Sequence, residues 1–147
     1  ALIEDLRDRL DFISVGSNDL TQYMLAVDRN NARVANLYDS FHPAVLQTLA
    51  TIVKSGHAAG LEVSICGEMA SDPLAVLLLL GMGYDTLSMN ASSLPKIKWV
   101  IRSISLAQAQ QWVKDSKTLR CSAEVRYYLE QALQHHGLSD LIRIGRS

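Results

Sequence analysis

The chain has 147 residues, of which 48% are apolar and 20% are charged, the balance of one globular domain with a real core. Fourteen basic residues against fifteen acidic ones leave a net charge of −1, so no global positive field would attract nucleic acid or anionic lipid. The longest apolar run, 74–80, is too short to cross a bilayer. The two cysteines lack metal-ligand spacing and predict a reducing, cytoplasmic setting.

Helical and strand patterns alternate through the first half of the chain. Residues 1–10 carry apolar side chains at helical spacing with no capping residue before them, so we expect a helix that continues a preceding segment. Ser17, Asn18 and Asp19 follow a short apolar run and offer N-caps for the next helix. The elements expected here are a strand at 12–15, a helix from 17 toward 27, a loop at 28–40, a helix at 43–60 and a strand at 62–66.

The second half contains one more strand and is otherwise helical. Asp72 before Pro73 is typical of a helix start, and Gly81 and Gly83 predict the end of that helix. The elements expected here are a helix at 74–80, a strand at 86–89 and helices at 95–103, 105–115 and 122–136.

This order of elements predicts an α/β fold with parallel strands, because a strand followed by a helix returns to the sheet through a right-handed crossover. Three parallel strands cannot cover both faces and both edges of their own sheet. We therefore expect residues 1–147 to form the C-terminal portion of a (β/α)8 TIM barrel, a fold of roughly 250 residues. Helices alone follow the third strand.

Polar side chains follow each of the three expected strands at its carboxyl end. Asn18 and Asp19 follow the first strand, Cys66 and Glu68 the second, and Asn90 the third. Active sites of parallel βα folds lie at that edge of the sheet, so these side chains should converge on one site.

Each of these residues also has a purely structural interpretation. Asn18 and Asp19 are suited to capping a helix, and Cys66 to filling a core as a small apolar side chain. Arg29 taken alone is typical of a solvated loop arginine, and His42 before Pro43 of a hydrogen-bonding partner at a helix start. The coincidence at all three strand ends favours a functional site over separate structural roles.

Three blocks of the sequence resemble the phosphoenolpyruvate-utilising enzymes, a family that includes Enzyme I of the sugar phosphotransferase system, pyruvate phosphate dikinase and phosphoenolpyruvate synthase. Residues 11–29, DFISVGSNDLTQYMLAVDR, match the family signature at every defining position. Residues 66–73, CGEMASDP, resemble its cysteine loop, and residues 80–90 its last barrel strand. Residues 30–43 and 123–143 are most similar to the nitrogen-related Enzyme I, in which a regulatory GAF domain precedes the phosphotransferase.

The resemblance implies a role for five residues. Asp19 would ligate Mg²⁺, Asn18 would bind phosphoenolpyruvate, and Arg29 would hold its phosphate. Cys66 would be the acid that protonates the enolate carbon as pyruvate forms. Glu68 would set the hydrogen bonding around that thiol.

The resemblance also implies that part of the site lies outside this chain. The family's second magnesium ligand is a glutamate on the preceding barrel strand, and Glu4 lies at the wrong end of the strand to replace it. The phosphorylated histidine belongs to a separate domain, which is absent here together with the GAF domain. Ser71 occupies a place where the family has glycine, so a positive φ there would strain the loop.

The function implied is that of a phosphoenolpyruvate–protein phosphotransferase of the nitrogen branch, inactive as this piece alone. It would pass a phosphoryl group from phosphoenolpyruvate to an enzyme histidine and on to a histidine-containing phosphocarrier protein, releasing pyruvate. One alternative is the barrel of a dikinase or synthase. The alternative of another class is a non-catalytic dimerisation module, and we expect a homo-oligomer because three strands leave their edges uncovered.

Overall fold

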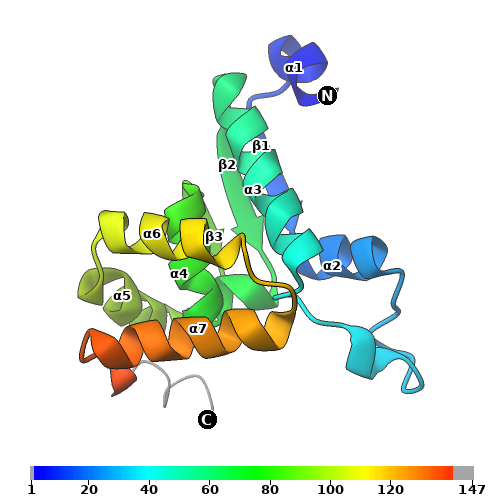
Figure 1. Ribbon diagram of the computed structural model, residues 1–147. Helices are drawn as coiled ribbons and strands as arrows, with labels where there is room; N and C mark the ends of the chain where they lie inside the picture. The colour runs from blue at the N-terminus through cyan, green and yellow to red at the C-terminus, as the bar shows by residue number, and fades with distance from the viewer. Residues whose placement is uncertain (1, 141–147) are drawn as a thin grey trace.

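The computed structural model describes residues 2–140, in which strands alternate with helices before a run of helices alone (Figure 1). The strands are β1 (Phe12–Gly16), β2 (Glu62–Cys66) and β3 (Thr86–Ser88). The α-helices are α1 (Leu2–Leu6), α2 (Ser17–Leu25), α3 (Pro43–Ala58), α4 (Pro73–Met82), α5 (Leu94–Ser103), α6 (Leu106–Ser116) and α7 (Ser122–His135). The 3-10 helices are η1 (Arg7–Arg9), η2 (Ala35–Leu37), η3 (Glu68–Ser71) and η4 (Ala91–Ser93).

The three strands form one parallel sheet in the order β1-β2-β3. The predicted α/β class is confirmed: the chain has three parallel strands with helices, the arrangement expected of part of a (β/α)8 barrel, followed by helices alone. The helix expected at 1–10 is shorter, because α1 ends at Leu6 and a 3-10 turn follows. Ala1 lies outside the described residues.

The two faces of the sheet differ in what covers them. Val63 and Ile65 on β2 are fully buried, and Val63 lies against Gly56 of α3, the helix that runs along the sheet in Figure 1. Side chains alternate along a strand, so Phe12, Ser14 and Glu62 lie on the opposite face, where all three are exposed. Helices therefore cover one face of the sheet and leave the other open within the part of the chain that the structure describes.

Helix α4 joins the sheet to the C-terminal helices. Residues 75–79 are completely buried, so this helix is apolar on all sides, as expected for a helix enclosed by other elements. Gly81, predicted to end the helix, instead lies inside it. A side chain at Gly81 would collide with the backbone of Ala109 on α6, so the glycine permits close helix packing, and Gly83 ends the helix at φ +95°.

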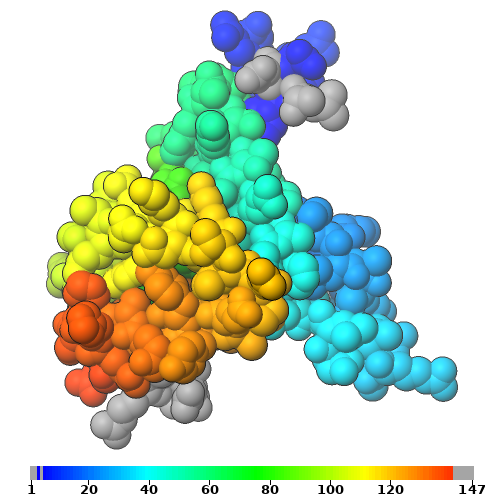
Figure 2. All heavy atoms as spheres, in the orientation of Figure 1, coloured from blue at the N-terminus to red at the C-terminus, as the bar shows by residue number. Residues whose placement is uncertain are grey.

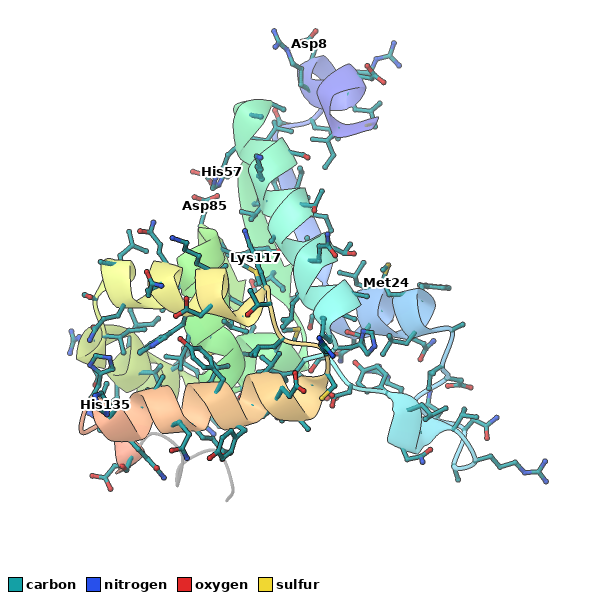
Figure 3. The ribbon with its side chains drawn as sticks, in the orientation of Figure 1. Asp8, Met24, His57, Asp85, Lys117 and His135 are labelled. Carbon is teal, nitrogen blue, oxygen red and sulfur yellow. The ribbon has the colours of Figure 1, made fainter. Side chains whose placement is uncertain are left out.

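Hydrogen bonds to the carboxylate of Asp85 join the amino-terminal ends of β2 and β3 to the end of α3. The Nε2 atom of His57 lies 2.9 Å from Oδ2 of Asp85, and the two side chains face each other in Figure 3. The same carboxylate oxygen accepts a 2.8 Å hydrogen bond from the backbone amide of Val63. That amide and, to a lesser extent, His57 hold the pKa of Asp85 below its ordinary value.

We predict that Asp85→Asn lowers the free energy of unfolding at pH 7 by about 1 kcal/mol, since a charge-assisted hydrogen bond is lost at a partly exposed site. The pKa of Asp85 is depressed in the folded state, so its stabilisation is present above the unfolded-state value and lost as pH falls below about 4. Urea unfolding at pH 7 and at low pH measures this difference. Asp11→Asn, at an exposed carboxylate without a partner among the described residues, is the control; equal losses in both variants would refute the prediction.

Candidate active site

The carboxyl ends of the three strands lie side by side. In the parallel register, Gly16 on β1 is opposite Cys66 on β2, which is in turn opposite Ser88 on β3. The residues that follow the strands therefore start from one edge of the sheet, as the sequence predicts. We call the two segments there the α2–α3 loop (residues 26–42) and the cysteine loop (residues 67–72).

Asn18 connects the end of β1 to the cysteine loop. Its Oδ1 atom accepts a 3.1 Å hydrogen bond from the backbone amide of Glu68 and a 3.4 Å hydrogen bond from the hydroxyl of Ser17. The prediction that Ser17, Asn18 and Asp19 cap a helix is wrong, because Gly16 is the N-cap residue and no side chain caps it. The amide of Asn18 instead holds a segment 50 residues away in sequence.

Gly67 is required for this contact on two counts. Its φ of +104° is one that residues with a side chain rarely adopt. A Cβ atom there would also collide with the hydroxyl of Ser17 and lie 3.0 Å from Oδ1 of Asn18. Glycine thus allows the chain leaving β2 to pass directly over the first turn of α2.

Arg29 and Glu68 meet across the site. Their Nη1 and Oε1 atoms are 3.8 Å apart, and the side chains are 38% and 75% exposed. Arg29 comes from the α2–α3 loop, which projects from the body of the molecule in Figure 2, and its amide donates to Oε1 of Gln22 on α2. The pair is therefore an exposed contact between the two loops, and the guanidinium keeps donors for another ligand.

Tyr38 is a residue of this site that the sequence analysis missed. Its hydroxyl donates a 3.5 Å hydrogen bond to the backbone carbonyl of Asn18. Partial burial, supported by the negative charge of Glu68, raises the pKa of Tyr38, while Thr21 and Arg29 oppose the rise. The phenol therefore stays protonated at neutral pH beside the Arg29–Glu68 pair. From the sequence alone, a tyrosine in a polar loop cannot be assigned to a functional site rather than to a packing role.

Asp19 is available to a cation. It is exposed in the first turn of α2, and its carboxylate has no hydrogen-bond or ion-pair partner among the described residues. Its Oδ2 atom lies near Gly16, at the end of β1. No group of three His, Cys, Asp or Glu side chains that could hold a metal occurs among residues 2–140. A single carboxylate fits Mg²⁺, which keeps waters and takes further oxygens from a phosphorylated substrate.

Cys66 ends the central strand as a half-buried free thiol. It lies on the same sheet face as Ser64, the face that no described helix covers. No hydrogen bond joins it to Glu68 among the described residues, since the Glu68 side chain pairs with Arg29. Ser71 does not strain the loop, because Ala26 alone among the described non-glycine residues has a positive φ.

His42 has the structural role that the sequence predicts. Its Nδ1 atom accepts a 3.2 Å hydrogen bond from the amide of Ala44 and caps α3, whose first residue is Pro43. It is therefore engaged at a helix start.

Comparison with known proteins agrees with this geometry. Residues 1–106 match the model of the PEP-binding domain of PEP-utilising enzymes, a span that includes all three strands and both loops. The chain belongs to the family of phosphoenolpyruvate-utilising enzymes. No helix among residues 2–140 is long and apolar enough to cross a membrane.

Curated relatives place the chain near the phosphotransferases of this family. It is 46% identical over 144 residues to a protein of Escherichia coli (strain K12) named "Phosphoenolpyruvate-dependent phosphotransferase system", covering 98% of this chain and 19% of the relative. It is 41% identical over 134 residues to the phosphoenolpyruvate-protein phosphotransferase of Haemophilus influenzae, covering 91% of this chain and 23% of the relative. The chain thus spans about a fifth of these relatives and is homologous to the catalytic PEP-binding domain of the enzyme.

We predict that Gly67→Ala lowers the free energy of unfolding by about 2 kcal/mol, because it strains the backbone and displaces Ser17 and Asn18. Gly60→Ala is the matched control: its φ is +75°, but an added Cβ would meet no atom within 4 Å. Urea unfolding compares a glycine at positive φ whose added Cβ collides with its neighbours and one whose added Cβ meets none. If the two variants lose the same stability, the close approach of Gly67 to the first turn of α2 contributes nothing to the free energy of unfolding.

Proposed function

We propose that this chain is the C-terminal part of the catalytic barrel of a phosphoenolpyruvate–protein phosphotransferase of the Enzyme I type, in its nitrogen branch. The observation that carries the proposal is the junction of two family motifs at one sheet edge, where Asn18 of the first holds the amide of Glu68 in the second. The curated relatives named above, both from phosphotransferase systems, favour this reading over a dikinase or synthase. The nitrogen branch rests on the resemblance of residues 30–43 and 123–143.

The proposed reaction assigns a task to each residue at the strand ends. Arg29 holds the phosphate of phosphoenolpyruvate, and Asn18 orients the substrate from the first turn of α2. The phosphorus–oxygen bond of the substrate breaks as a phosphorus–nitrogen bond to a histidine forms. Cys66 then gives its proton to the enolate carbon, which releases pyruvate and leaves a thiolate to be reprotonated.

Magnesium fits the free carboxylate of Asp19, which would hold it together with oxygens of the substrate. The ion would supply positive charge against the phosphate and the developing enolate. Glu68 balances the charge of Arg29 in this structure, and the arriving phosphate would displace its carboxylate. We propose this exchange as the role of Glu68.

The proposed parent enzyme is larger than this chain. One face of the sheet, with Phe12 62% exposed, lacks a covering layer among the described residues, as expected if five more strands close the barrel over it. Within this proposal, the accepting histidine and any GAF domain belong to other domains of the cytoplasmic parent protein, and a histidine-containing phosphocarrier receives the phosphoryl group. This chain alone would be inactive and would bind phosphoenolpyruvate weakly.

A non-catalytic dimerisation module is the second candidate. The observation in its favour is the pair of outer strands, β1 and β3, each of which pairs with β2 alone among residues 2–140. Sedimentation of this chain at micromolar concentration tests that reading. A compact monomer would contradict both a homo-oligomer and an assembly role.

We predict that Asp19→Asn in the complete enzyme slows phosphoryl transfer from phosphoenolpyruvate by at least about 100-fold, since the magnesium ligand is lost. Transfer of labelled phosphate to the enzyme histidine, measured against magnesium concentration, is the readout. Asp28→Asn is the control, because Asp28 accepts a hydrogen bond from the amide of Asn30 that asparagine can keep. Without labelled histidine in the unchanged enzyme the proposed function fails, and unimpaired transfer in Asp19→Asn contradicts the metal role.

We predict that Cys66→Ala in the complete enzyme impairs protonation of the enolate more than it impairs phosphorylation of the histidine, because the thiol acts after the phosphoryl group has left. Rapid-quench measurement of phosphohistidine, alongside solvent-deuterium incorporation into pyruvate, separates the two steps. Equal slowing of both steps would exclude the proton-donor role.

A further inference from the structure

Arg126 on α7 contacts both loops of the candidate site. Its Nη2 atom lies 3.4 Å from Oδ1 of Asp39 in the α2–α3 loop, and its Nη1 atom lies 4.0 Å from Oδ2 of Asp72 in the cysteine loop. Its guanidinium also stacks on the ring of Phe41, 3.9 Å from the ring centre. One planar cation therefore contacts two anions and one aromatic ring across two segments.

Each of the two carboxylates already organises its own loop. Oδ1 of Asp39 accepts a 2.9 Å hydrogen bond from the amide of Phe41, which is fully buried. Oδ1 of Asp72 accepts from the amides of Leu74 and Ala75 and caps α4. Arg126 thus contacts anchored carboxylates, so a shift of its side chain would be transmitted to backbone rather than absorbed by flexible groups.

The same two loops are joined a second time at the candidate site. Asn18 contacts the α2–α3 loop through Tyr38 and the cysteine loop through the amide of Glu68. A cavity of about 260 Å³ touches residues of both connections, since Tyr38 and Glu68 line it together with Arg126 and both of its carboxylates. Asn18 and Arg126 therefore each contact both loops.

Arg126 lies outside the span that matches the PEP-binding domain, which ends at residue 106. Helix α7 begins beside the segment that leads into α3, as Figure 1 shows, so its first turns are placed where an arginine can reach the loops. The contact links a C-terminal helix to the two segments that carry Arg29 and Cys66.

We propose that Arg126 is a positioning residue for the phosphoenolpyruvate site, which fixes the distance between the loop that carries Arg29 and the loop that follows Cys66. This role rests on the proposed function. Arginine is suited to it because a planar fork can pair with two carboxylates while its face stacks on a ring, and lysine cannot do both. Removing the guanidinium leaves the reacting groups in place but lets the two loops separate.

The test compares Arg126→Met, which keeps an apolar stem, and Arg126→Lys with the unchanged complete enzyme. We expect the KM for phosphoenolpyruvate to rise about tenfold in both variants, with a smaller effect on kcat, because substrate contacts from two loops are misaligned. Hydrogen exchange should increase in both loops, at 26–42 and 67–72. Arg102→Met, at an exposed arginine on α5 without an ion pair among the described residues, should change neither quantity.

A double-mutant cycle with Asp39→Asn gives a second measurement, since asparagine keeps the acceptor for Phe41 and removes only the charge. We expect the effects of Asp39→Asn and Arg126→Met on KM to be less than additive. Faster hydrogen exchange in the loops with an unchanged KM would show that Arg126 has a structural role only. A raised KM with unchanged hydrogen exchange would show that separation of the loops does not cause the rise in KM. If the unchanged enzyme does not use phosphoenolpyruvate, the proposed function is wrong. Hydrogen exchange in this chain then still shows whether Arg126 holds the two loops together.

Discussion

The hydrogen bond from the amide of Glu68 to the side chain of Asn18 is the contact on which the candidate site depends. Parallel strands end at one edge of a sheet, but the edge alone does not determine how close the following segments come. Gly67 allows the chain to pass over the first turn of α2, and Asn18 then fixes it there. The Arg29–Glu68 pair joins the two loops beside this junction, and the phenol of Tyr38 donates to the carbonyl of Asn18 itself.

Most of the fold could be predicted from the sequence because its signals are local. Apolar runs ended by glycine mark β1 and β2, and Asp72 with Pro73 marks the start of α4. Gly81 shows the limit of such signals. A glycine near the end of an apolar helix resembles a stop signal, and only the position of α6 shows that it serves close packing.

The candidate site could be predicted in its location but not in its connections. Asn18 was expected at the strand end, but its hydrogen-bond partner lies 50 residues away. This partner could not be predicted, because the residue types that cap helices also make tertiary hydrogen bonds. Arg126 and Asp39 are separated by 87 residues, and no periodicity in the sequence relates them. Long-range pairs of this kind follow from the folded arrangement of helices, which a pattern of local preferences does not specify.

The open face of the sheet has a consequence for how the covered face is stabilised. Ser14, Ser64 and Thr86 are register partners across the three strands, so the middle row of that face consists of hydroxyl side chains. Exposure of hydroxyl side chains to water has a small free-energy cost, whereas Val63 and Ile65 on the opposite face are buried under helices of the same chain and Phe12 is the exposed apolar side chain of the open face. The burial that stabilises these strands is thus local to the segment. Burial of Val63 and Ile65 therefore needs no side chain from the open face of the sheet.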